Sequence, residues 1–293
     1  MPTATLNRAV VSGDVSLAVA SGGRPGDPTV VFIHGYPDTK EMWEPVMAQL
    51  ADRFHVVAYD VRGAGASDAP RGPAAYHLAH LADDLARVCD ELSPGRPVHL
   101  VGHDWGGIQG WEFVTDPRFA GRIASFTSIA GPALGHALSA ARSALRRRDP
   151  LGALDRARRS WYVVGLCLPG GPTIAWRLVL RGRGWRRFLA GAERAPVDAG
   201  YPSPTVRADG LHGANLYRAN IPRRLVGRHR MGTAHAPVQL IVPLRDRYIS
   251  PRYYDAAGRV APGVRRRVID GSHWAPRNHP DVIARWIAEF AGG

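Results

Sequence analysis

The stretch that decides the fold is Val101-Gly102-His103-Asp104-Trp105-Gly106-Gly107. It begins in an apolar, β-branched run and continues into residues that suit a helix, so it predicts a strand, a tight turn and a helix. The spacing, with a glycine two residues before and two residues after a central side chain, is that of a nucleophile elbow. The glycines let the strand and the helix approach closely, and the turn projects the central side chain at the sheet edge. Here that central residue is an acid, Asp104.

On both sides of this turn the sequence alternates between short apolar runs and amphipathic segments. The alternation is typical of the α/β class, in which helices cover both faces of a mostly parallel sheet. The expected strands are Thr29–Ile33, His55–Tyr59, Pro97–Val101, Ile123–Ile129, Val238–Val242 and Val264–Ile269, and the clearest expected helices are Tyr76–Leu92 and Asp281–Phe290.

The alternation stops between Pro132 and Ala236, where Arg, Gly, Pro and Trp are frequent and only patches such as Ser160–Leu168 and Ile174–Leu180 have helical spacing. An insertion that leaves a sheet after one strand and returns to it at the next predicts a lid over the sheet's C-terminal edge. Open α/β sheets bind their ligands at that edge. We therefore expect a core made of residues 1–131 and 237–293, with a cap, or lid, at 132–236.

The positive charge of the chain is concentrated in the same segment. The formal net charge is +13, and between His136 and Met231 there are 19 arginines against 5 acidic residues, an excess of 14 positive charges. Such a segment could attract nucleic acid, an anionic lipid or an acidic substrate. No nucleic-acid-binding motif accompanies the charge. We therefore expect no nucleic-acid partner, and we favour a solvated Arg-rich surface while leaving open a weak contact with anionic surfaces.

Two further residues follow Asp104 in the order nucleophile, acid, histidine that belongs with this type of elbow. Asp246 stands just past one expected strand, and His273 lies in the loop after the next. His273 would be the general base, and Asp246 would orient its ring. Asp270, an acid in the same loop as His273, could compete only for the orienting role.

A second loop supplies candidate backbone donors. His34-Gly35-Tyr36-Pro37 follows an expected strand, and the backbone N–H of Tyr36, together with that of Trp105, could stabilise a developing oxyanion. A cis peptide bond between Tyr36 and Pro37 would preset this loop.

Taken together, these motifs resemble the epoxide hydrolase branch of the α/β-hydrolases over almost the whole chain. The nearest resemblance is to the hydrolase half of actinobacterial proteins that fuse an epoxide hydrolase to a short-chain reductase, so a chain ending at Gly293 is either free-standing or an excised half. The stretches that carry the resemblance are His34–Pro37, Asp60–Asp68, Gly102–Gly107 and His273-Trp274.

The resemblance also implies two tyrosines in the lid, and it matches them to Tyr162 and Tyr217. Substrate binding would fall to Tyr36 and Trp105, and to Trp161, for which a place in the core is the alternative. The implied reaction opens an epoxide to a vicinal diol. Asp104 would attack the epoxide carbon to form an alkyl ester, the tyrosines would donate to the ring oxygen, and water activated by His273 would hydrolyse the ester.

Two other functions remain as alternatives. A haloalkane dehalogenase would use the same aspartate, but Tyr36 stands where that family commonly has a halide-binding asparagine. A non-catalytic, ligand-binding protein on the same fold is disfavoured by the complete set of Asp104, Asp246 and His273.

The remaining expectations concern the setting of the protein. The first thirty residues lack the pattern of a signal peptide, and two distant cysteines, Cys89 and Cys167, fit neither a disulfide framework nor a metal site. We therefore expect a cytoplasmic enzyme with no metal or organic cofactor, whose partners are water and a small apolar epoxide. Which epoxide it takes, with what selectivity, and whether it is a monomer or a dimer are left open.

Overall fold

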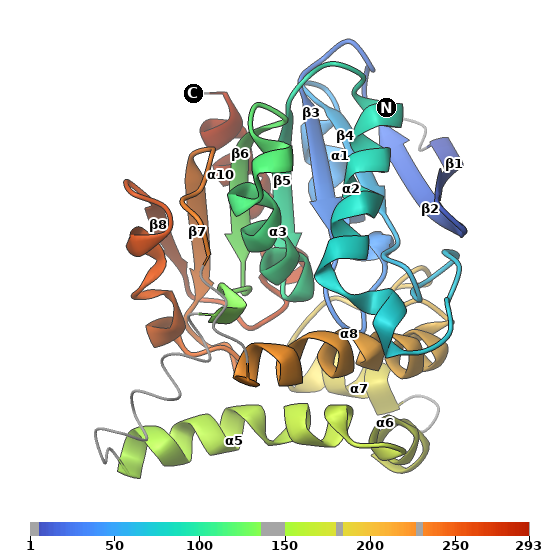
Figure 1. Ribbon diagram of the computed structural model, residues 1–293, viewed down its shortest axis with the longest axis vertical. Helices are drawn as coiled ribbons and strands as arrows, with labels where there is room; N and C mark the ends of the chain where they lie inside the picture. Colours follow the sequence, from blue (N-terminus) through green and yellow to red (C-terminus); the bar gives the residue numbers. More distant parts are fainter. Residues whose placement is uncertain (1–5, 136–149, 180–183, 227–230, 293) are drawn as a thin grey trace.

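The computed structural model describes residues 6–135, 150–179, 184–226 and 231–292. Its centre is a sheet of eight strands in the order β1-β2-β4-β3-β5-β6-β7-β8 (Figure 1). Pairing is antiparallel between β1 and β2 and between β2 and β4, and parallel at every other junction. The strands are β1 (Leu6–Ser12), β2 (Val15–Gly22), β3 (Thr29–Ile33), β4 (His55–Tyr59), β5 (Val98–His103), β6 (Ile123–Ile129), β7 (Val238–Pro243) and β8 (Arg265–Ile269).

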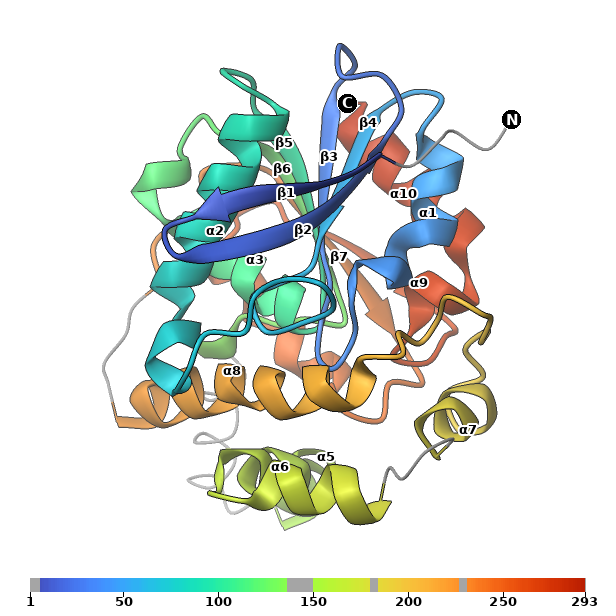
Figure 2. The same ribbon diagram turned by 90° about the vertical axis from the view of Figure 1, so that its right-hand side faces the viewer.

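Helices cover both faces of this sheet, as Figures 1 and 2 show. Successive side chains of a strand point to opposite faces of the sheet, so a central strand contributes residues to two hydrophobic cores. In β3, Val31 and Ile33 pack into the core under α2 (Leu78–Leu92) and α3 (Trp105–Thr115). Val30 and Phe32 of the same strand pack into the second core with α1 (Glu44–Leu50), α9 (Ala275–Asn278) and α10 (Pro280–Ala291). The expected α/β architecture with a mostly parallel sheet is confirmed.

All six strands expected from the sequence are present, with ends within two residues of the prediction. The hairpin β1–β2 and helix α1 were not predicted. The hairpin does carry a usable signal, since Val15, Leu17 and Val19 are buried in alternation with half-buried neighbours after a turn at Gly13. Within the described part of the chain, no helix has both the length and the apolarity needed to cross a bilayer.

The helices between β6 and β7 lie along the carboxyl ends of the parallel strands, and we call α5–α8 the cap. Figures 1 and 2 show α8 next to the sheet and α5 and α6 beyond it. The expected patch Ser160–Leu168 falls at the end of α5, and Ile174–Leu180 matches a π-helical turn only in part, with Leu180 outside the described residues. The members are α5 (Pro150–Cys167), α6 (Gly171–Ile174), the π-helical turn Ala175–Val179, α7 (Gly184–Gly191) and α8 (Val206–Val226).

Candidate active site

Asp104 lies at the turn between β5 and α3 with a backbone φ of 51°, a conformation that L-residues rarely adopt. Two glycines permit this turn. A Cβ on Gly102 would lie 2.3 Å from the carbonyl oxygen of Gly106, and a Cβ on Gly106 would lie 2.1 Å from that of Ile33. The local sequence therefore folds as an elbow that presents the Asp104 side chain at the sheet edge.

The three residues expected to act together are close in space and almost fully buried. His273 Nε2 lies 3.6 Å from Asp104 Oδ2, and His273 Nδ1 lies 2.8 Å from Asp246 Oδ2. The other oxygen of Asp246 accepts hydrogen bonds from the backbone N–H groups of Tyr248 (2.7 Å) and Ile249 (2.9 Å). The carboxylate is thus fixed on both sides and holds the imidazole ring toward Asp104.

Burial and neighbouring charges shift the pKa values of His273 and Asp104 in opposite directions. Burial alone would lower the pKa of His273, but the carboxylates of Asp246 and Asp104 raise that pKa to about 9. Burial raises the pKa of Asp104, while His273 and the backbone N–H groups of Tyr36 and Trp105 act in the opposite direction. At neutral pH the His273 ring therefore keeps its second proton between these two acidic side chains.

The backbone donors are also in place. The N–H of Tyr36 donates to Asp104 Oδ1 at 2.9 Å, and the N–H of Trp105 bonds to the same carboxyl group. The peptide bond between Tyr36 and Pro37 is cis, as expected. The phenol of Tyr36 points to the cap, where it donates to the carbonyl oxygen of Gly210 and accepts from Trp176 Nε1, each at 3.0 Å.

Both tyrosines expected in the lid approach the core residues of the site. Tyr217, on α8, is 5% exposed, and its ring centroid lies 4.9 Å from that of Trp105 and 5.2 Å from that of Tyr36. Tyr162, on α5, lies 6.3 Å from Tyr217, measured between ring centroids. Burial holds the pKa of each phenol well above its usual range, and the charge of Asp104 adds to the shift. Both hydroxyls therefore stay protonated.

Trp161 differs from the expectation. Its side chain is 72% exposed, whereas the neighbouring Tyr162 is partly buried and packs against the core. Successive residues of a helix point about 100° apart, so Tyr162 can pack against the core while Trp161 is exposed. A side chain this exposed cannot wall an enclosed pocket, and Trp161 is neither a core residue nor a pocket residue in this structure.

Other residues were missed or left undecided by the sequence. Tyr248 packs between Tyr162 and His273, with ring-centroid distances of 5.5 and 5.0 Å, and its place two residues after Asp246 could have indicated it. Asp270 is exposed and pairs with Arg245, so it does not compete with Asp246. His103 Nε2 lies 2.9 Å from the carbonyl oxygen of His273 and supports that loop from below.

Asp38, which was also missed, is a buried acid beside the site. Its carboxylate accepts hydrogen bonds from Tyr201 Oη (2.7 Å), in the segment before α8, and from Trp274 Nε1 (2.8 Å), next to His273. Burial raises its pKa to about 6, although these two hydrogen bonds act in the opposite direction. Asp38 thus joins a cap segment to the loop that carries the histidine.

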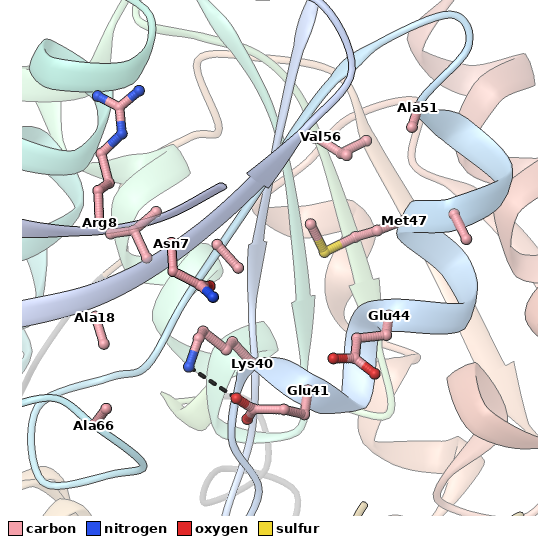
Figure 3. Close-up of a pocket in the computed structure, with 14 residues that line it drawn as sticks. Asn7, Arg8, Ala18, Lys40, Glu41, Glu44, Met47, Ala51, Val56 and Ala66 are labelled. Carbon is pink, nitrogen blue, oxygen red and sulfur yellow. Dashed lines mark hydrogen bonds and ion pairs between the residues drawn. The ribbon is translucent and has the colours of Figure 1, made fainter. Parts of the chain in front are cut away.

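A separate cavity of about 550 Å³ lies between the β1–β2 hairpin and α1. Figure 3 shows that both apolar and polar side chains line it, including the ion pair between Lys40 and Glu41 (2.8 Å). The residues that line it do not include Asp104, Asp246 or His273, so this cavity is distinct from the candidate active site.

Comparisons with known proteins agree with this geometry. The family model of the alpha/beta hydrolase fold matches residues 28–157. The chain is 38% identical over 297 residues to "Probable oxidoreductase EphD" of Mycobacterium tuberculosis, covering 99% of this chain and 50% of that protein. It thus spans about half the length of this curated relative.

Other relatives match along their whole length. "AB hydrolase superfamily protein YfhM" of Bacillus subtilis is 31% identical, with 96% of each chain covered. "Epoxide hydrolase A" of Mycobacterium tuberculosis is 29% identical, with 99% of this chain and 98% of that protein covered. Among solved structures, an epoxide hydrolase from Bacillus megaterium superposes with a TM-score of 0.82 at 20% identity, covering 98% of this chain and all of that one. The elbow, the sheet and the full-length likeness to YfhM lead to one conclusion: the chain belongs to the α/β-hydrolase superfamily.

Proposed function

We propose that the chain is an epoxide hydrolase that opens an epoxide to a vicinal diol through an ester on Asp104. The observation that carries the proposal is the placement of two phenols beside a buried aspartate and its oriented histidine. Tyr217 packs against Trp105, next to Asp104, and Tyr162 packs against Tyr248, which contacts His273. The likeness to proteins named as epoxide hydrolases, including a full-length relative at 29% identity, supports the same reaction.

In the first step, Asp104 Oδ2 attacks a ring carbon of the epoxide. Oδ1 accepts from the Tyr36 N–H, and Oδ2 is the oxygen that lies 3.6 Å from His273 Nε2, so we assign Oδ2 as the nucleophile. A new bond forms between Oδ2 and carbon, the ring C–O bond breaks, and the ring oxygen leaves with a developing negative charge. Tyr162 and Tyr217 donate hydrogen bonds to that oxygen, because an unassisted alkoxide is a poor leaving group.

In the second step, His273 activates water. The ester no longer carries the charge of Asp104, which was one of the groups that raised the pKa of His273. The pKa of the ring therefore falls once the ester has formed, and the imidazolium gives its proton to the ring-derived oxygen, which becomes the first hydroxyl of the diol. The neutral imidazole can then take a proton from water as a base. Water attacks Cγ of Asp104, and the Tyr36 and Trp105 N–H groups stabilise the resulting oxyanion. The diol leaves with the former Oδ2, and the oxygen from water remains on Asp104.

The proposed substrate is a small apolar epoxide, because aromatic rings surround the reacting carboxylate. The ring centroid of Tyr217 lies 4.9 Å from that of Trp105 and 5.2 Å from that of Tyr36. We propose residues 132–236 as the functional cap, since they carry both phenols.

The test is a panel of aliphatic and aromatic epoxides and of haloalkanes, assayed for diol and for halide with the unaltered chain and with Asp104→Ala. We expect diol from at least one epoxide and none from the variant. Halide release without diol formation would establish the dehalogenase alternative. Binding of the epoxides without turnover would support the non-catalytic alternative.

A further inference from the structure

Large apolar side chains are exposed in a cluster on the cap. Four of them lie within fourteen residues of one another, on α5, on α6 and at the corner between the two helices. The exposed fractions are 72% for Trp161, 62% for Val164, 55% for Leu168 and 60% for Ile174. Single exposed apolar residues are ordinary on a protein surface, but a contiguous cluster indicates a binding surface.

Helix α5 packs one face against the core and exposes another. Tyr162 and Leu166, four residues apart, point inward and pack with the core. Trp161, Val164 and Leu168 follow each other at spacings of three and four residues, so they share the opposite face. In Figures 1 and 2, α8 lies between the sheet and α5, and α5 and α6 form the layer farthest from the sheet. We call Trp161, Val164, Leu168 and Ile174 the outer apolar face.

The surroundings of the outer apolar face are positively charged. Arg158 lies one turn before Trp161, and Arg177 follows Ile174 by three residues; both are exposed. In residues 158–177 and 184–225, the acids Glu193 and Asp209 are buried, and the exposed Asp198 is paired with Arg277. The exposed arginines of these two stretches are Arg158, Arg177, Arg187, Arg194, Arg207 and Arg223. Positive charge on the cap surface is therefore little offset by free carboxylates in this part of the chain.

We propose that the outer apolar face binds the surface of a membrane that contains anionic lipid. A helix at an interface typically combines a row of Trp and aliphatic side chains with arginines that reach lipid headgroups. The indole ring of Trp161 suits the headgroup region, where tryptophan is enriched. The arginines would be attracted to an anionic leaflet and would supply the charge complementarity. The contact is peripheral, and it does not depend on the proposed reaction.

Membrane binding would account for the difference in burial between the adjacent residues Trp161 and Tyr162 of α5. Tyr162 packs against the core and Tyr248, whereas Trp161 is exposed, so α5 would stand between the lipid surface and the site. An apolar molecule dissolved in that lipid would then be released close to the cap.

The experiment is co-sedimentation of the chain with vesicles of phosphatidylcholine alone and with vesicles containing 30% phosphatidylglycerol. The test variants are Trp161→Ser combined with Leu168→Ser, and Arg158→Gln combined with Arg177→Gln. Val11→Ser is the matched apolar control, because Val11 is 61% exposed on β1, away from the cap. Arg71→Gln, at another exposed arginine, is the matched charge control. Asp104→Ala should bind like the unaltered chain, which separates this inference from the proposed function.

We expect binding to the phosphatidylglycerol vesicles that is weakened at least fivefold by each double substitution and by 1 M NaCl, since salt screens the arginines. The two controls should leave binding unchanged. Brominated lipid should quench the fluorescence of the unaltered chain more than that of Trp161→Phe. Failure to bind, equal binding to both vesicle types, or equal binding by the double variants would overturn the proposal. Sedimentation velocity provides a further test: a dimer that Trp161→Ser/Leu168→Ser dissociates would show that the face binds a second copy instead.

Discussion

The core and the cap contribute to the same site in different ways. The core supplies Asp104, Asp246 and His273 from loops that directly follow strands, and their positions depend on backbone geometry. The cap supplies Tyr162 and Tyr217 from helices, and the positions of these phenols depend on how the helices pack. The three core residues would suit any substitution reaction that passes through an aspartyl ester. The two cap tyrosines would suit a reaction whose leaving group must be protonated. In the proposed reaction, therefore, the core would determine the type of intermediate and the cap would determine the bond that can be broken.

The largest effect is expected at the nucleophile. Asp104→Ala should lower diol formation by roughly 10⁴-fold or more, since losing a covalent nucleophile typically leaves only the contribution of binding and oxyanion donors. A single turnover of excess unaltered enzyme in heavy-oxygen water should put the label on the peptide that contains Asp104. If the label appears only in the diol, water attacks the epoxide directly and no ester forms.

The next largest effect is expected at His273, and it distinguishes ester formation from ester hydrolysis. His273→Gln should slow ester hydrolysis by about 10²–10⁴-fold, the usual contribution of a general base, while ester formation continues. Intact-protein mass spectrometry should then detect an increase of one substrate mass. Asp270→Asn, at the exposed acid near His273, is the control and should turn over normally. Turnover by His273→Gln near the unaltered rate would rule out the assigned base.

The cap should affect the opposite step. Tyr162→Phe and Tyr217→Phe should each slow ester formation by about 10²–10³-fold, because each removes a donor to the ring oxygen. Hydrolysis of an ester already formed should change little. Tyr59→Phe is the matched control, since the buried Tyr59 hydroxyl has no hydrogen-bond partner among the described residues. Normal alkylation by the double variant, measured before the steady state, would contradict the role of the cap and favour the dehalogenase reaction.

The smallest effect concerns Asp38, where the cap meets the histidine loop. Because burial raises the pKa of Asp38 from 3.8 to about 6, the folded state holds this proton more tightly than the unfolded chain. The associated stability is present below pH 3.8 and is lost as pH rises through about 6, by at most about 3 kcal/mol. Asp38→Asn should flatten this part of the unfolding free-energy profile, measured by denaturant titration at several pH values.

Tyr201→Phe provides the complementary measurement. It removes a hydrogen bond that lowers the pKa of Asp38, so the loss of stability should extend to higher pH. If neither variant changes the pH profile, the carboxyl group of Asp38 does not titrate in this range.

The sequence predicted the core well and the cap poorly, for a physical reason. Asp104, Asp246 and His273 each follow a strand whose apolar run is continuous, and parallel strands bring their carboxyl ends to one edge of the sheet. No comparable rule fixes the rotation of a cap helix. The resemblance to a family indicated Tyr162 and Tyr217, but the face of α5 that Trp161 occupies became known only from the packing of its neighbours. Asp38 could not be predicted because its partners, Tyr201 and Trp274, are 163 and 236 residues away.

Tyr36 has a consequence for exchanging caps between relatives by protein engineering. Its N–H donates to Asp104 and belongs to the proposed oxyanion hole, but its hydroxyl bonds to Gly210 and Trp176 in the cap. The fit is close, because a Cβ on Gly210 would lie 2.0 Å from the Trp176 ring. A chimera that joins a foreign cap at Pro132 and Ala236 would keep Tyr36 and lose both of its partners. The unit to exchange is therefore larger than the continuous cap segment. A transplanted cap needs the His34–Pro37 loop from the same donor protein.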